Sequence, residues 1–108
     1  MTTFAELGVD QDIVDALSAK GIVDAFTIQE QTIPLGLPGQ DIIGQAKTGT
    51  GKTFGFGIPV VQRLGLDPAP GVQALIVVPT RELAVQVYED MDMLTSNRST
   101  SVVAIYGG

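Results

Sequence analysis

Ala46-Lys47-Thr48-Gly49-Thr50-Gly51-Lys52-Thr53 is the stretch that decides the fold: it has the spacing A-x-x-x-x-G-K-T, follows the apolar pair Ile42-Ile43 and precedes a run that can be helical. Gly49 and Gly51 let the backbone turn tightly, with no Cβ to block a phosphate. Successive N–H groups then point into one concavity, and the positive end of the following helix adds to their field. The pattern predicts a strand, a phosphate-binding loop and a helix, in that order.

Two side chains of this loop carry the expected chemistry. Lys52 is predicted to reach the β- and γ-phosphates of a nucleotide, and the Thr53 hydroxyl is predicted to bind Mg²⁺. The alternative is an ordinary glycine-rich loop with a surface lysine. The nucleotide-binding residues predicted from the loop are Ala46, Lys47, Thr48, Gly49, Thr50, Gly51, Lys52 and Thr53.

Composition excludes several classes of function. The chain has 108 residues, with neither cysteine nor histidine, so a thiolate or histidine zinc site and a Ser/His or Cys/His catalytic pair are ruled out. We expect no membrane span, because no apolar run is long enough, and no secretory signal at the N-terminus. These features favour an intracellular, cytoplasmic protein.

The net charge of −6, with only six lysines and arginines, argues against a generic basic nucleic-acid binder. Two of the basic residues, Lys47 and Lys52, already lie in the phosphate loop. The charge leaves room for a few placed nucleic-acid contacts, or for a basic partner domain.

Hydrophobic spacing predicts four helices. Asp10 and Thr80 are expected to cap the first and the fourth, and Thr27 the second, which Pro34 should limit to two turns or kink. In the fourth helix, Leu83 and later apolar residues are expected to form one buried face. The helix after the loop is rich in glycine, and its small residues should permit close approach to a sheet. The expected helices span about residues 10–20, 27–35, 51–64 and 80–94.

Three apolar runs, residues 41–45, 73–78 and 101–106, are predicted to be strands. Alternation of strands and helices predicts an α/β fold with a parallel sheet, flanking helices and right-handed crossovers. At this length, residues 1–108 are expected to be one small domain or a piece of a larger one.

The chain resembles the N-terminal part of a DEAD-box ATP-dependent RNA helicase over essentially its whole length. Residues 21–29 occupy the place of the family's Q motif, and Phe4 lies upstream at the family's spacing. The phosphate loop follows. Residues 79–84, Pro-Thr-Arg-Glu-Leu-Ala, match motif Ia letter for letter, and the Gly107-Gly108 pair comes after the last strand. The resemblance implies an incomplete RecA-like domain of the P-loop NTPase class.

The resemblance implies an adenine site. An amide such as that of Gln29 can pair bidentately with adenine N6 and N7, and Phe4 could stack on the purine face. The alternatives are that Phe4 is an ordinary core residue and that Gln29 is a surface residue of a helix. Ile22, Ala25 and Phe26 depart from the family's usual Q motif, which puts in doubt the stiffness of this segment and the second wall of the pocket.

The resemblance also implies contacts to the RNA backbone from Pro79, Thr80, Arg81, Gly107 and Gly108. A threonine hydroxyl, an arginine and a helix N-terminus are all groups that contact phosphates. The alternatives are that Thr80 is only a helix cap, that Arg81 pairs with a nearby acid, and that the glycine pair is a turn.

The resemblance implies that the residues completing ATP hydrolysis lie beyond residue 108, in the Asp-Glu-Ala-Asp motif and a second domain. We therefore expect ATP and Mg²⁺ as cofactors and RNA as a partner of the parent helicase, but no turnover by this chain alone. ATPase activity above blank would contradict that. A second class of function is a non-catalytic nucleotide-binding or assembly module. A GTPase is disfavoured because no Asn-Lys-x-Asp or Thr-Lys-x-Asp motif occurs.

In folds of this kind the phosphate-loop strand and the motif Ia strand are not neighbours, because later strands fill the gap between them. Unpaired strands leave backbone groups and apolar faces uncovered. The chain is therefore expected to close the gap by a different strand pairing or to associate with a second copy.

Overall fold

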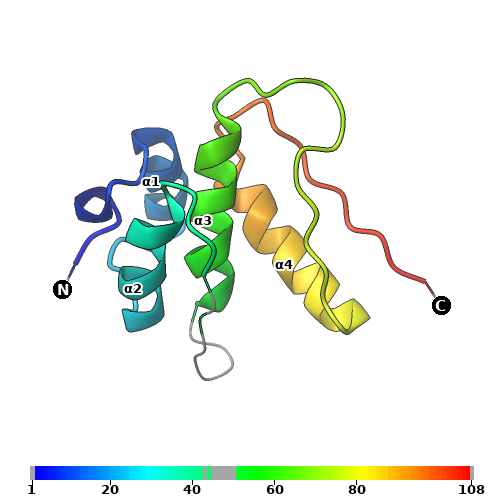
Figure 1. The fold of residues 1–108 in the computed structure, drawn as a ribbon, viewed down its shortest axis with the longest axis horizontal. Helices are drawn as coiled ribbons and strands as arrows, with labels where there is room; N and C mark the ends of the chain where they lie inside the picture. Colours follow the sequence, from blue (N-terminus) through cyan, green and yellow to red (C-terminus); the bar gives the residue numbers. More distant parts are fainter. Residues whose placement is uncertain (1, 43, 45–50, 108) are drawn as a thin grey trace.

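The computed structural model describes residues 2–42, 44 and 51–107. Figure 1 shows α3 in the middle of the molecule, with α1 and α2 on one side and α4 on the other. The four expected helices are present, with ends close to the predicted ones. The elements are the 3₁₀ helix η1 (Ala5–Leu7), α1 (Gln11–Ser18), α2 (Thr27–Gly36), α3 (Lys52–Leu64) and α4 (Arg81–Leu94).

The helix N-termini differ in how they are capped. Thr80 caps α4 as predicted, since its Oγ1 accepts a hydrogen bond of 3.2 Å from the backbone N–H of Leu83. Asp10 stands at the N-cap of α1, but its side chain makes no capping bond. The prediction for Thr27 is wrong, because Thr27 is the first residue of α2 and Phe26 is the N-cap.

The core lies between the helices and the N-terminal segment. Leu83 was expected on the buried face of α4, yet it is 38% exposed, because α4 contributes fully buried residues only from its second half. The buried apolar residues are Phe4, Val9, Ile13, Ala16, Leu17, Ala25, Ile33, Ile58, Val61, Met91 and Leu94.

Small residues let α3 approach its neighbouring helices closely. A Cβ added at Gly57 would lie 2.7 Å from the Met91 Sδ of α4. On the other side, a Cβ added at Gly36 of α2 would lie 2.8 Å from the Pro59 ring. The sequence predicted that the glycines of α3 serve contact with a sheet, but Gly57 serves helix–helix packing instead.

The parallel sheet is not confirmed. Within the described part of the chain no strand forms, and the structure has one isolated antiparallel bridge, between Thr3 and Asp24. Residues 73–78 and 101–106 have no regular secondary structure, and residues 41–45 lie partly outside the described residues. A strand needs a hydrogen-bonded neighbour, and the described residues supply none. The expected alternative strand pairing is likewise not seen there.

Residues 73–78 and 101–106 nevertheless keep the side-chain alternation of strands. Ile76 is half-buried, while Leu75 and Val77 are 83% and 82% exposed. Val102 is half-buried, while Ile105 is 89% exposed. We call the outward apolar side chains of the two segments the open face; its members are Leu75, Val77, Val103 and Ile105.

Among the described residues, no helix is both long and apolar enough to cross a bilayer.

Candidate functional site

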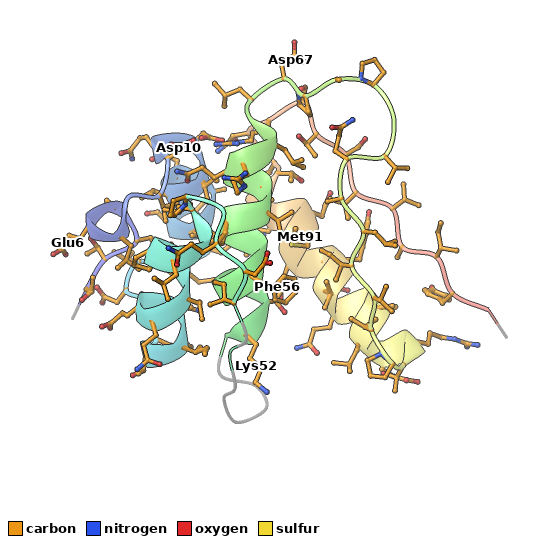
Figure 2. All side chains as sticks on the ribbon, viewed as in Figure 1. Glu6, Asp10, Lys52, Phe56, Asp67 and Met91 are labelled. Atoms are coloured by element: carbon orange, nitrogen blue, oxygen red, sulfur yellow. The ribbon has the colours of Figure 1, made fainter. Side chains whose placement is uncertain are left out.

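The end of the phosphate loop opens α3. Gly51 is the N-cap, with φ of 81°, a left-handed conformation that favours glycine. Lys52 is exposed, and Figure 2 shows its side chain extending away from the lower end of α3. The predicted loop residues 46–50 lie outside the described residues. In the described part of the chain, Lys52 therefore lies at the N-terminus of α3, and this combination of positive charges favours binding of an anion.

Gln29 holds this end of the loop against α2. Its side chain is 2% exposed, and its Oε1 accepts a hydrogen bond of 2.8 Å from the backbone N–H of Phe26. Its Nε2 donates a bond of 3.0 Å to the Gly51 carbonyl. A Cβ added at Gly51 would collide with this amide. These two bonds leave one N–H and one lone pair of the amide unused, and at 2% exposure both are covered in this structure, so pairing with adenine stays a prediction.

Phe4 lies in the hydrophobic core. It is 1% exposed and packs in the same cluster as Val9, Leu17 and Ile33. Its backbone carbonyl accepts the N–H of Val9. The ring presents no open face to a purine here, so stacking on adenine stays a prediction that requires the N-terminal segment to move.

Asp90 of α4 lies near the threonine of the phosphate loop, which the sequence did not predict. Burial raises the pKa of Asp90 above its ordinary value, and the nearby Thr53 hydroxyl opposes the rise. One feature of the sequence could have indicated this position. Asp90 lies three residues after Val87 and four before Leu94, and this spacing places its carboxylate beside the buried face of α4.

These groups suit Mg²⁺ chemically. Magnesium prefers oxygen ligands and is commonly bound by one or two protein oxygens together with phosphates and water. The Thr53 hydroxyl, with the Asp90 carboxylate beside it, meets that description. The described residues contain no cluster of three or more histidine, cysteine or acidic side chains that could hold a metal ion without such help.

A second group of predicted residues meets at the start of α4. Arg81 donates a hydrogen bond of 3.0 Å from Nη2 to the Gly107 carbonyl, and its guanidinium lies 5.5 Å from the centre of the Tyr106 ring. Thr80 caps the helix, and Pro79 precedes it. Gly108 lies outside the described residues. Two segments far apart in the sequence are thus joined at one helix N-terminus.

A buried arginine joins three parts of the fold. The Arg98 side chain is 0% exposed and binds Asp12 at 2.6 Å and Asp10 at 2.8 Å. Its Nη1 also donates a bond of 3.0 Å to the Val61 carbonyl of α3. The bond from Arg98 lowers the pKa of Asp12, and Asp12 in turn raises the pKa of Arg98. The sequence did not predict this cluster.

The model of the DEAD/DEAH box helicase family matches residues 26–108. The ATP-dependent RNA helicase CshA of Listeria monocytogenes is 50% identical over 108 residues, which cover 100% of this chain and 21% of that protein. The chain therefore spans about a fifth of the length of this relative.

Solved structures agree with these sequence matches. The RNA helicase Prp28 of Chaetomium thermophilum, bound to ADP, gives a TM-score of 0.90 at 33% identity, over 100% of this chain and 27% of that chain. Dbp5 of S. cerevisiae, bound to RNA and ADP BeF3, gives a TM-score of 0.80 at 32% identity, over 90% of this chain and 25% of that chain.

Proposed function

The chain belongs to the DEAD/DEAH box helicase family, and from this premise we propose that it is the ATP-binding part of an RNA helicase. In this proposal residues 1–108 are the N-terminal portion of a RecA-like domain whose parallel sheet is completed by further strands. The whole protein couples ATP binding and hydrolysis to RNA unwinding, in the cytoplasm. The observation that carries the proposal is the bond from Gln29 to Gly51, which joins the expected adenine reader to the phosphate loop.

ATP occupies the mouth of the loop in this account. Lys52 neutralises the β- and γ-phosphates, and the N–H groups at the start of α3 bind their oxygens. The Thr53 hydroxyl would hold Mg²⁺, which would supply charge neutralisation for the phosphates. Gln29 uses its remaining N–H and lone pair on adenine. Hydrolysis depends on acidic and arginine groups from other parts of the protein, so this chain alone is expected to bind nucleotide weakly without turnover.

RNA contacts the start of α4. The N-terminus of α4 and the guanidinium of Arg81 are both suited to phosphate oxygens. The bond from Arg81 to Gly107 holds the two segments together, so that both motifs meet one stretch of backbone. Because these contacts go to the phosphates, they position the RNA and do not read its sequence.

Adenine recognition predicts that ATP competes for the 108-residue chain at least about fivefold better than GTP, since one good bidentate pair discriminates by about 1–3 kcal/mol. Gln29→Ala removes that preference. Competition against a fluorescent adenosine nucleotide measures it, with folding checked by circular dichroism. Gln31→Ala is the matched control, because Gln31 is an exposed residue of the same helix. If ATP and GTP compete equally well for the wild-type chain, adenine recognition is contradicted. The site would then bind phosphates without distinguishing the base.

The open face favours the alternative of an assembly module. Its four apolar side chains are between 78% and 89% exposed, and residues 73–78 and 101–106 carry no charged side chain. Two copies can therefore bring these segments together without charge repulsion, despite the net charge of −6. We propose that a second copy of the chain covers this face when the remaining strands of the domain are absent.

If the chain self-associates, its fraction of dimer should rise with protein concentration. Sedimentation equilibrium measures that fraction. Ile105→Lys is expected to weaken the dimer at least about tenfold, because it places a charge in an apolar contact. Val23→Lys is the control, since Val23 is 51% exposed and lies outside the open face. A chain that stays monomeric at every concentration, with the open face uncovered, contradicts the proposal.

A further inference from the structure

We propose that Phe26 is the aromatic side chain that stacks on the base of a bound nucleotide. This inference rests on the proposed function, because it adds a residue to the same nucleotide site. The resemblance implied Phe4 for this role and marked Phe26 only as a departure from the Q motif. In the structure Phe4 is 1% exposed and lies in the core, whereas Phe26 is 57% exposed. Of these two rings, Phe26 is the one that a base can reach without a movement of the chain.

The ring of Phe26 lies against the residue that opens α3. A Cβ added at Gly51 would lie 2.9 Å from Cδ2 of the ring, so the ring contacts this glycine directly. Gly51 is the N-cap of α3, and the exposed Lys52 follows it. The ring therefore adjoins the end of α3 where the phosphates of the proposed nucleotide bind. A flat apolar side chain at this place suits the base of that nucleotide.

Two hydrogen bonds hold the backbone of Phe26 at this place. Its N–H donates a bond of 2.8 Å to Oε1 of Gln29, and Nε2 of Gln29 donates a bond of 3.0 Å to the Gly51 carbonyl. Gln29 is 2% exposed, so water does not compete for these bonds. A single exposed phenylalanine is ordinary on a protein surface. Here a buried amide ties the exposed ring to the N-cap of α3, which fixes an aromatic surface at the nucleotide site before a ligand binds.

Stacking on the base and pairing with its edge have different signatures. A stacked aromatic ring tolerates every base, because every base has a π-face. The amide of Gln29, in contrast, is expected to distinguish adenine from guanine. Loss of the Phe26 ring should therefore weaken the binding of ATP and GTP by the same factor. It should not weaken the binding of tripolyphosphate, which has the charged tail of ATP and no base.

Isothermal titration calorimetry of the 108-residue chain measures its affinities for ATP, GTP and tripolyphosphate. Phe26→Ala is expected to lower the affinities for ATP and GTP at least about fivefold each, in the range for removing one stacking ring, and to leave that for tripolyphosphate unchanged. Phe56→Ala is the matched control, because Phe56 is 38% exposed and lies further along α3. It is expected to change none of the three affinities. Circular dichroism checks that both variants keep their helices.

Phe26→Trp supplies a direct readout, because the chain has no tryptophan of its own. ATP is expected to quench the indole emission of this variant, whereas saturating tripolyphosphate leaves it unchanged. Equal weakening of all three ligands by Phe26→Ala overturns the inference, since the ring would then act on the phosphate site or on the fold. Unchanged affinity for ATP in Phe26→Ala also overturns it and leaves the proposed function standing. A wild-type chain that binds neither ATP nor tripolyphosphate overturns both.

Discussion

Lys52→Glu is expected to lower the affinity of the whole protein for ATP at least about 100-fold. A hydrogen bond to a charged group contributes about 1.5–3 kcal/mol, and every 1.4 kcal/mol is about tenfold in affinity. Replacing the ammonium with a carboxylate loses that bond and adds repulsion from the phosphates. Titration of a fluorescent ATP analogue at fixed ionic strength measures the effect.

Stability is expected to change little, because Lys52 is exposed and extends away from the helices (Figure 2). Lys20→Glu is the matched control: it makes the same change of charge on an exposed residue in the turn after α1. A loss confined to Lys52→Glu shows a local contact, whereas equal losses in both variants reflect net charge alone. Unchanged affinity in Lys52→Glu removes the basis for a phosphate site here.

Local patterns predicted the helices well, because each helix depends on its own periodicity and end residues. Thr80 caps α4 since one hydroxyl and one backbone N–H three residues apart suffice. The strands depend on partners elsewhere. Residues 73–78 have the composition and the side-chain alternation of a strand, yet they form no ladder in the described part of the chain. Sequence pattern predicts the tendency to form a strand and cannot supply the missing neighbour.

The site was predictable to the extent that its residues form a contiguous motif. Lys52 and Arg81 were singled out by motif, and the structure joins Arg81 to the Gly107 carbonyl by a hydrogen bond. The bond from Gln29 to Gly51 and the approach of Asp90 to Thr53 join residues from different helices. They depend on how α2, α3 and α4 pack, which spacing along a single helix does not specify.

Arg98 shows that the sequence also failed to identify a residue that stabilises the fold. It occurs in a polar loop between α4 and residues 101–106, where an arginine is ordinarily a solvated surface residue. In the structure its side chain is 0% exposed and bridges Asp10, Asp12 and the Val61 carbonyl. Such a bridge joins the start of α1 to α3 and to the end of α4. A polar loop thus contains one of the contacts that hold the helices together.

Arg98→Met is accordingly expected to lower the free energy of unfolding by about 3 kcal/mol, in the range for breaking a buried ion pair. The apolar stem is kept, while the Val61 carbonyl and Asp12 lose their partner. Urea denaturation followed by circular dichroism measures the change. Arg63→Met is the control, since Arg63 is exposed and makes one long bond of 3.4 Å to the Leu37 carbonyl. It is expected to cost about 0.5 kcal/mol or less.

The effect of Arg98→Met also depends on pH in a definite direction. The bond from Arg98 lowers the pKa of Asp12 below 3.8 in the folded chain. A lowered carboxyl pKa adds stability that is present above the unfolded value and is lost as the pH falls through the folded value. The difference in stability between the wild type and Arg98→Met should therefore be constant near neutral pH and shrink below about pH 3.8. A difference that stays constant into acid would show that packing, and not the ion pair with Asp12, carries the contribution of Arg98.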